Sequence, residues 1–253
     1  MSEPKAFSGT SEDEDEEDVG RVGALIPDGI EAPAELIGDE MLSRATTEGP
    51  AASEFVLENM RNDPRPKVQA KGCSAVSQIA ETPPGRTTLH EKGAVEVVVA
   101  AMSSAMPDEI ELQAKGCSAI ANLSIGEGES AVLSKGGLAA VLAAASAHPA
   151  EASVQLKVCT ALGNIAYGSA GEVRVLAGGG LEAVVTAMKA HSADAALQEE
   201  GVDALVNIAD SADAKKRLLA LGGLAVVAAA KKHANCAATA GELATGLVAA
   251  AKA

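Results

Sequence analysis

Two kinds of side chain that bind metals or do redox chemistry recur in this chain at regular intervals. They are three cysteines, 44 and 42 residues apart, and three histidines, 43 and 42 residues apart: Cys73, Cys117 and Cys159, and His148, His191 and His233. If each interval is one structural repeat, neighbouring members lie about 10 Å apart. That separation is too large for a disulfide or for a shared metal ion. We therefore predict no disulfide and no metal site among them.

The positions of these residues indicate structural roles instead. Val202 and Ala244 take the cysteine position in later repeats, so the position needs a small apolar side chain and the three cysteines should pack in the core. Each histidine follows an apolar run, where a hydrogen-bond donor complements the carbonyl end of a helix. Cys236 lies outside this register, and we predict that it is the exposed thiol.

Motifs of the main catalytic and cofactor-binding classes are missing. The chain contains no GxxxxGK[ST] phosphate loop, no GxSxG nucleophile elbow and no HExxH zinc motif. The sequence therefore predicts a protein that is not an enzyme and that uses no cofactor.

The net charge of −15 is concentrated at the N-terminus. Residues 1–50 contain 14 acidic and 3 basic side chains, a net −11, whereas residues 51–253 contain 21 and 17, a net −4. Such a chain is a poor candidate for general nucleic-acid binding, which needs clustered Lys and Arg. We expect residues 1–33 to form an acidic disordered tail, with a candidate phosphorylation site at Ser11 beside the acidic run.

Targeting and membrane signals are also missing. The acidic N-terminus has no apolar signal sequence, and the longest apolar runs, such as the one at 138–147, are about half the ~20 residues that span a bilayer. We expect no membrane insertion. A cytoplasmic location is the expectation, with the nucleus as the alternative.

The chain repeats itself every 42 to 44 residues. Four related strings begin with glutamine: QAKGCSAVSQIA at Gln69, QAKGCSAIANLS at Gln113, QLKVCTALGNIA at Gln155 and QEEGVDALVNIA at Gln198. A glycine that precedes an apolar run keeps the same interval, at Gly93, Gly136, Gly179 and Gly222. A period of this length is typical of solenoids built from two or three helices per repeat.

Three helices are predicted in each repeat. In the best-defined one, a short helix at 130–135 ends at Gly136, where a positive φ closes a helix. A middle helix at 138–147 then ends before Pro149. The long third helix, around 113–125, has apolar residues at the i, i+3, i+4, i+7 spacing of one helix face.

This order of helices, with glycine between the first two and A-L-x-N-I/L-A in the third, resembles the armadillo repeat family. The spelling KGC-x-A-I/L-x-N-L/I is similar to the armadillo-type repeats of leucine-rich-repeat kinases, although the chain has no kinase segment. The resemblance implies an all-α, right-handed helical solenoid of about four and a half repeats, preceded by an N-terminal helix or linker at 34–50. The expected repeats are approximately 51–84, 85–127, 128–169, 170–211 and 212–253.

In the armadillo fold the third helices line a concave groove that binds extended peptides. The matching positions here share one helix face, and they are Lys71, Ser74 and Gln78, then Lys115, Ser118 and Asn122, then Lys157, Thr160 and Asn164, then Glu200, Asp203 and Asn207. The resemblance implies that the asparagine amides, which offer donors and an acceptor, pair with the backbone of a bound peptide. We therefore expect a module that binds a protein or an extended peptide.

Charge and composition narrow the expected partner. The stripe changes from lysines to Glu200 and Asp203 along its length, which favours a partner with both acidic and basic segments. Nuclear-import adaptors of the family carry tryptophan four residues before the asparagine, and this chain has none, so a nuclear transport adaptor is a disfavoured alternative. A structural subunit of a cytoskeletal or ciliary assembly is another. The acidic tail is itself a candidate occupant of the lysine end.

Overall fold

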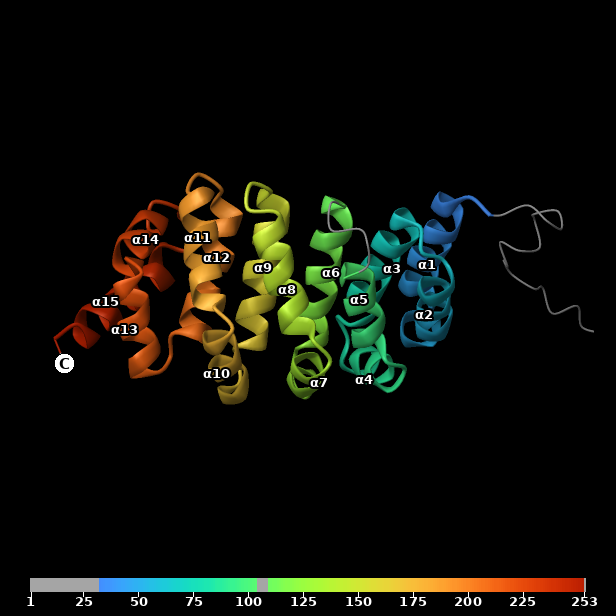
Figure 1. The fold of residues 1–253 in the computed structure, drawn as a ribbon, viewed down its shortest axis with the longest axis horizontal. Helices are drawn as coiled ribbons and strands as arrows, with labels where there is room; N and C mark the ends of the chain where they lie inside the picture. The colour runs from blue at the N-terminus through green and yellow to red at the C-terminus, as the bar shows by residue number, and fades with distance from the viewer. Residues whose placement is uncertain (1–31, 104–108, 253) are drawn as a thin grey trace, which may run out of the picture.

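The computed structural model describes residues 32–103 and 109–252, and every structural statement below concerns these two ranges. The helices stack in one row, with α1 at one end and α15 at the other (Figure 1). No β-strand occurs in the described ranges. The predicted all-α solenoid is therefore confirmed, whereas the predicted tail and Ser11 lie outside the described residues.

Each repeat after the first contains a short, a middle and a long helix, and the first contains only the middle and the long one. The short helices are α4 (Pro83–Glu91), α7 (Gly128–Ser134), α10 (Ser169–Ala177) and α13 (Ala212–Ala220). The middle helices are α2 (Ser53–Asn62), α5 (Ala94–Ser103), α8 (Gly137–Ala147), α11 (Gly180–Ala190) and α14 (Gly223–Ala230). The long third helices are α3 (Pro66–Ile79), α6 (Ile110–Leu123), α9 (Ala152–Ile165), α12 (Ala195–Ile208) and α15 (Ala237–Ala250). Before them come α1 (Ala34–Glu48) and the 3-10 helix η2 (Gly49–Ala52).

The turn from each short helix to the next middle helix depends on glycine. A left-handed φ of 75° to 87° occurs at each of the four repeated positions, Gly93, Gly136, Gly179 and Gly222. A residue with a Cβ adopts this conformation only at a cost. The regular glycine interval seen in the sequence is therefore a regular backbone turn, as predicted.

The third helices form the continuous spine of the molecule. Helices α3, α6, α9 and α12 pack side by side in that order, and α1 packs on α3 in the same way. Ion pairs join α1 to α3, from Lys67 to Glu35 and from Lys71 to Asp39. Helix α1 thus adds one more member to the row of third helices.

Four buried glutamines connect the first four middle helices to their third helices. Three of these glutamines donate a side-chain N–H to the backbone carbonyl oxygen of an equivalent methionine near the end of the middle helix. The distances are 2.6 to 2.9 Å, for Gln69 to Met60, Gln113 to Met102, and Gln198 to Met188. Gln155 donates in the same way to Ala145, at 2.9 Å. The last carbonyls of a helix have no partner within the helix. These glutamines, which open the repeated strings, supply one.

The same middle-helix position sets the size of the facing residue on the third helix. A Cβ added at Gly72, Gly116 or Gly201 would lie 2.4 to 2.6 Å from the methionine Cγ opposite it. In the remaining repeat the methionine is replaced by Ala145, and the glycine position holds Val158. A larger side chain at one position is thus accompanied by a smaller one at the other. A well-packed core tolerates such paired changes because the total side-chain volume is conserved.

This pairing predicts a coupled pair of substitutions in the second repeat. Gly116→Val should lower the free energy of unfolding by about 1–3 kcal/mol, because valine overpacks against Met102. Adding Met102→Ala copies the third repeat and should cost less than the two single substitutions together, by about 0.5 kcal/mol or more. Urea denaturation of the four proteins measures both effects. Additive costs would show that the two positions do not share volume.

Candidate functional site

The twelve predicted groove residues lie on one surface, which we call the third-helix face. Three come from each of the helices α3, α6, α9 and α12. None of the twelve is buried, although their neighbours at Cys73, Cys117, Cys159 and Val202 are. The stripe read from the sequence is thus an accessible row of polar side chains.

The asparagines of this row make bonds that the sequence analysis did not predict. Each side-chain amide donates to a backbone carbonyl of the preceding third helix: Asn122 to Ser77 at 2.9 Å, Asn164 to Ala121 at 3.1 Å, and Asn207 to Gly163 at 3.1 Å. Each acceptor residue comes directly before the residue that holds the asparagine position in the preceding repeat, which is Gln78, Asn122 or Asn164. One N–H therefore holds neighbouring repeats together. Asn122 also donates to Ser77 Oγ at 3.0 Å, whereas Asn164 and Asn207 keep the second N–H and the amide oxygen for a ligand.

The acidic end of the row surrounds a hollow of about 300 Å³ between α9 and α12. Its lining includes Thr160, Asn164, Glu200, Asp203 and Asn207, five of the predicted residues. Thr160 Oγ1 lies 2.8 Å from Glu200 Oε2. The structure thus brings these five side chains together.

Negative charge is concentrated in this hollow. Partial burial, followed by the nearby charges of Glu200 and Glu199, raises the pKa of Asp203 above its usual value. Burial first, and Glu200 second, raises the pKa of the Cys159 thiol to about 12. Carboxylates that oppose one another's ionisation are stabilised by an added cation, so the hollow favours a positively charged group.

The basic end is smaller than the sequence analysis predicted. Lys71 forms an ion pair with Asp39 of α1, and Gln78 Nε2 donates to Thr46 Oγ1 at 2.8 Å. Within the described residues, Lys115 and Lys157 form no such ion pair. Two of the three predicted lysines thus remain for a ligand. Lys157 lies on α9, which lines the acidic hollow, and Lys115 lies on the preceding third helix, α6.

His148 and His191 are the C-cap residues of α8 and α11, at the ends of the middle helices as predicted, and the rings of His191 and His233 in addition connect repeats. His191 Nε2 lies 2.9 Å from the carbonyl oxygen of Pro149, and His233 Nε2 lies 3.1 Å from that of Ser192. Both acceptors belong to the turn of the preceding repeat. The rings therefore hold adjacent turns together, which a position at the end of a helix does not reveal.

The three cysteines in register are buried, as predicted, and burial raises the pKa of the Cys73 and Cys117 thiols to about 12. The prediction that Cys236 is exposed is wrong, because its residue is only 1% exposed. Its Sγ donates to the Ala230 carbonyl oxygen at 3.2 Å. The last repeat has Ala240 at the glutamine position, so this thiol takes over the contact with the end of the middle helix.

No group of three or more His, Cys, Asp or Glu side chains that could hold a metal ion occurs among the described residues. In the same ranges, no single helix is long and apolar enough to cross a membrane, and only the bent pair α7–α8 passes that test when its two helices are taken together.

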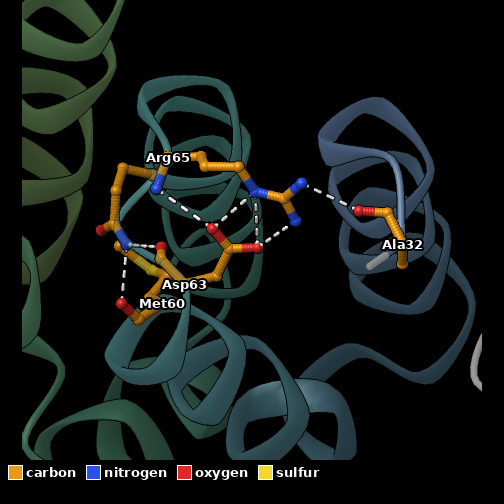
Figure 2. Close-up of polar contacts among 5 residues, drawn as sticks. Ala32, Met60, Asp63 and Arg65 are labelled. Atoms are coloured by element: carbon orange, nitrogen blue, oxygen red, sulfur yellow. Dashed lines mark hydrogen bonds and ion pairs between the residues drawn. The ribbon is translucent and has the colours of Figure 1, made fainter. Parts of the chain in front are cut away.

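A charged network fixes the N-terminal end of the row (Figure 2). Arg65 donates through Nε to Asp63 Oδ1 at 2.9 Å and through Nη1 to the Ala32 carbonyl oxygen at 2.9 Å. The hydrogen bonds from Arg65 lower the pKa of Asp63. This network attaches the segment before α1 to the turn between α2 and α3.

Comparison with solved structures identifies the architecture. A designed protein described as a computationally designed armadillo repeat protein for modular peptide recognition matches with a TM-score of 0.61 and 19% identity, over 87% of this chain and 89% of that one. The fold is an armadillo-type repeat fold. Two engineered proteins match this chain with TM-scores of 0.74 and 0.72, each at 22% identity. The matches cover 86% and 87% of this chain and 94% and 93% of theirs. No protein-family model and no curated protein matches the chain.

The raised pKa of Asp203 predicts that ionisation of this carboxyl lowers the stability of the fold. A carboxyl whose pKa is raised in the folded state destabilises the fold once it ionises, so this cost is present at neutral pH and absent well below the unfolded pKa of about 3.9. Asp203→Asn should therefore raise the thermal midpoint at pH 7, and the gain should shrink towards pH 3. Differential scanning calorimetry at several pH values tests this. Asp213→Asn, at an exposed position on α13, is the control. If Asp203→Asn raised the thermal midpoint equally at every pH, the prediction would be contradicted.

Proposed function

We propose that this chain is a non-catalytic scaffold that binds an extended peptide along the third-helix face. The observation that carries the proposal is the juxtaposition of opposite charges without mutual pairing. Lys115 and Lys157 lie on consecutive third helices, and Glu200 and Asp203 follow on the next one. The designed armadillo neighbour, whose description names peptide recognition, supports this type of ligand.

The spacing of the row defines the peptide. Neighbouring third helices lie about 10 Å apart, which corresponds to about three residues of extended chain. An acidic residue that contacts Lys115 or Lys157 would therefore stand roughly three to six residues from a basic residue in the hollow between α9 and α12. The free N–H and oxygen of Asn164 and Asn207 would bind the peptide backbone between them.

A peptide with two acidic and two basic residues at this spacing tests the proposal. We expect the wild-type chain to bind it in one of its two sequence directions, and to bind a scrambled peptide of equal composition more weakly. Complementary charge of this kind controls partner choice and orientation more than affinity. Because the charges are exposed, binding should weaken as salt is added. Fluorescence anisotropy with labelled peptides measures both effects.

Charge reversal identifies the surface. Lys157→Glu should weaken binding roughly tenfold, in the range expected for loss of one charged contact and gain of a repulsion, and a peptide with Lys in place of its acidic residues should restore it. Lys215→Glu on α13, away from the row, is the matched control. If the reversed peptide fails to restore binding, or if Lys215→Glu has the same effect, the third-helix face is not the binding site.

A further inference from the structure

A second ladder of charges runs along the other side of the solenoid, where short helices meet the middle helices of the preceding repeat. Lys92 pairs with Glu54 at 2.6 Å, and Lys135 pairs with Glu96. At the last junction, Arg217 Nε pairs with Glu182 at 2.7 Å. Each pair bridges one junction between consecutive repeats.

One junction in this ladder is different. Between α8 and α10, Ala139 holds the position of Glu96, three residues after the repeated glycine, and Gly178 holds the position of Lys92 and Lys135, one residue before it. The acidic member and the lysine are therefore both missing from this junction, whereas Arg174 holds the position of Arg217, five residues before the repeated glycine. Gly178 has a φ of −79°, which any residue adopts, so the backbone does not need glycine here.

The missing side chains open the surface. A hollow of about 360 Å³ is lined by Leu138, Ala139 and Gly178, among others, and it adjoins a second hollow of about 350 Å³. The two share Leu142 and Gly178 as a common wall. Between α2 and α5, a hollow of about 390 Å³ holds the position equivalent to that of the second hollow. The Lys92–Glu54 ion pair holds the position equivalent to that of the first hollow. We call the two adjoining hollows between α8 and α11 the middle-helix groove.

The rim of this groove is apolar and carries one cation. Val173, one helical turn before the lining residue Ala177, is 63% exposed. Arg174 lines the first hollow, is exposed, and forms no side-chain hydrogen bond or ion pair with the described residues. Glu182, at the far end, is already engaged by Arg217. The first hollow thus combines an apolar lining with the positive charge of Arg174, whereas the lining of the second also includes Ser146, Thr186 and Glu182.

We infer that the middle-helix groove binds an amphipathic helix of a partner protein. Side chains at i and i+4 of a helix lie about 5–6 Å apart, which suits two hollows that share a wall. Each hollow has room for at least one large aliphatic side chain, and helices that dock in grooves use anchors at this spacing. An acidic side chain beside the anchors pairs with Arg174 and sets the direction of the helix. No residue lines both this groove and the acidic hollow between α9 and α12.

The test uses a synthetic helical peptide of about 18 residues, long enough to be helical alone, with Leu at i and i+4 and Glu one turn further. Ala139→Glu combined with Gly178→Lys copies the first two junctions and should close the first hollow. The atoms nearest to the added Cβ are Leu142 Cδ1, at 3.1 Å on a side chain that can rotate, and the Arg174 carbonyl oxygen, at 3.3 Å, so a small adjustment keeps the fold. We expect this double variant to bind the peptide roughly tenfold more weakly than the wild type, and Arg174→Glu to weaken it as well. Fluorescence anisotropy gives the affinities, and methyl NMR shifts at Leu138 and Leu142 locate the site.

Lys115→Glu, on the third-helix face, should leave binding of the helical peptide unchanged, which separates this inference from the proposed peptide site. Equal affinity for the double variant and the wild type would overturn the inference, as would the absence of binding at millimolar peptide. If the wild-type chain instead forms a dimer that Ala139→Glu with Gly178→Lys dissolves, the groove binds a second copy and the partner helix is excluded.

Discussion

The side-by-side packing of the third helices is the constraint on which the rest of this structure depends. Each repeat buries its apolar surface only against its neighbours, and the chain has only three aromatic residues with which to fill the space. Small aliphatic residues, glycine and cysteine therefore occupy the spine. As a result, the third helices lie close enough for an asparagine side chain to donate to a backbone carbonyl of the preceding third helix. Because that packing exposes one stripe of every third helix, the polar row follows directly from the core.

Repeats that differ in sequence keep the same contacts by compensation. Where methionine is lost at Ala145, the facing glycine is replaced by Val158. Where the buried glutamine is lost at Ala240, the thiol of Cys236 donates to the end of the middle helix. What is conserved between the repeats is therefore a volume and a hydrogen bond rather than a residue type, as expected for interiors packed at uniform density with satisfied carbonyls.

Periodicity predicts which helices form and which face of each is buried, so the helix order, the glycine turns and the buried cysteines were accessible from the sequence. It does not predict which atom of the neighbouring repeat lies opposite a side chain, because that depends on a displacement of one residue along the helix. For this reason the acceptors of Asn164 and His191 were missed. The pairing of Lys71 with Asp39 was missed for a related reason: a helix was expected at this end, but it lacks the repeated string, so its register against α3 could not be counted from the sequence.

The two faces of the solenoid depart from their repeats in the same part of the chain. On the third-helix face, Glu200 and Asp203 of α12 replace the lysine and hydroxyl residues of the earlier rows. On the other side, Ala139 and Gly178 replace an ion pair between α8 and α10. Raised pKa at Asp203 and open apolar surface at Leu142 both oppose folding stability, whereas restoring the repeat would remove both costs. Both departures lie beside α9, which packs against α8 and α12 alike, so a ligand bound on either face would contact elements supported by the same helix.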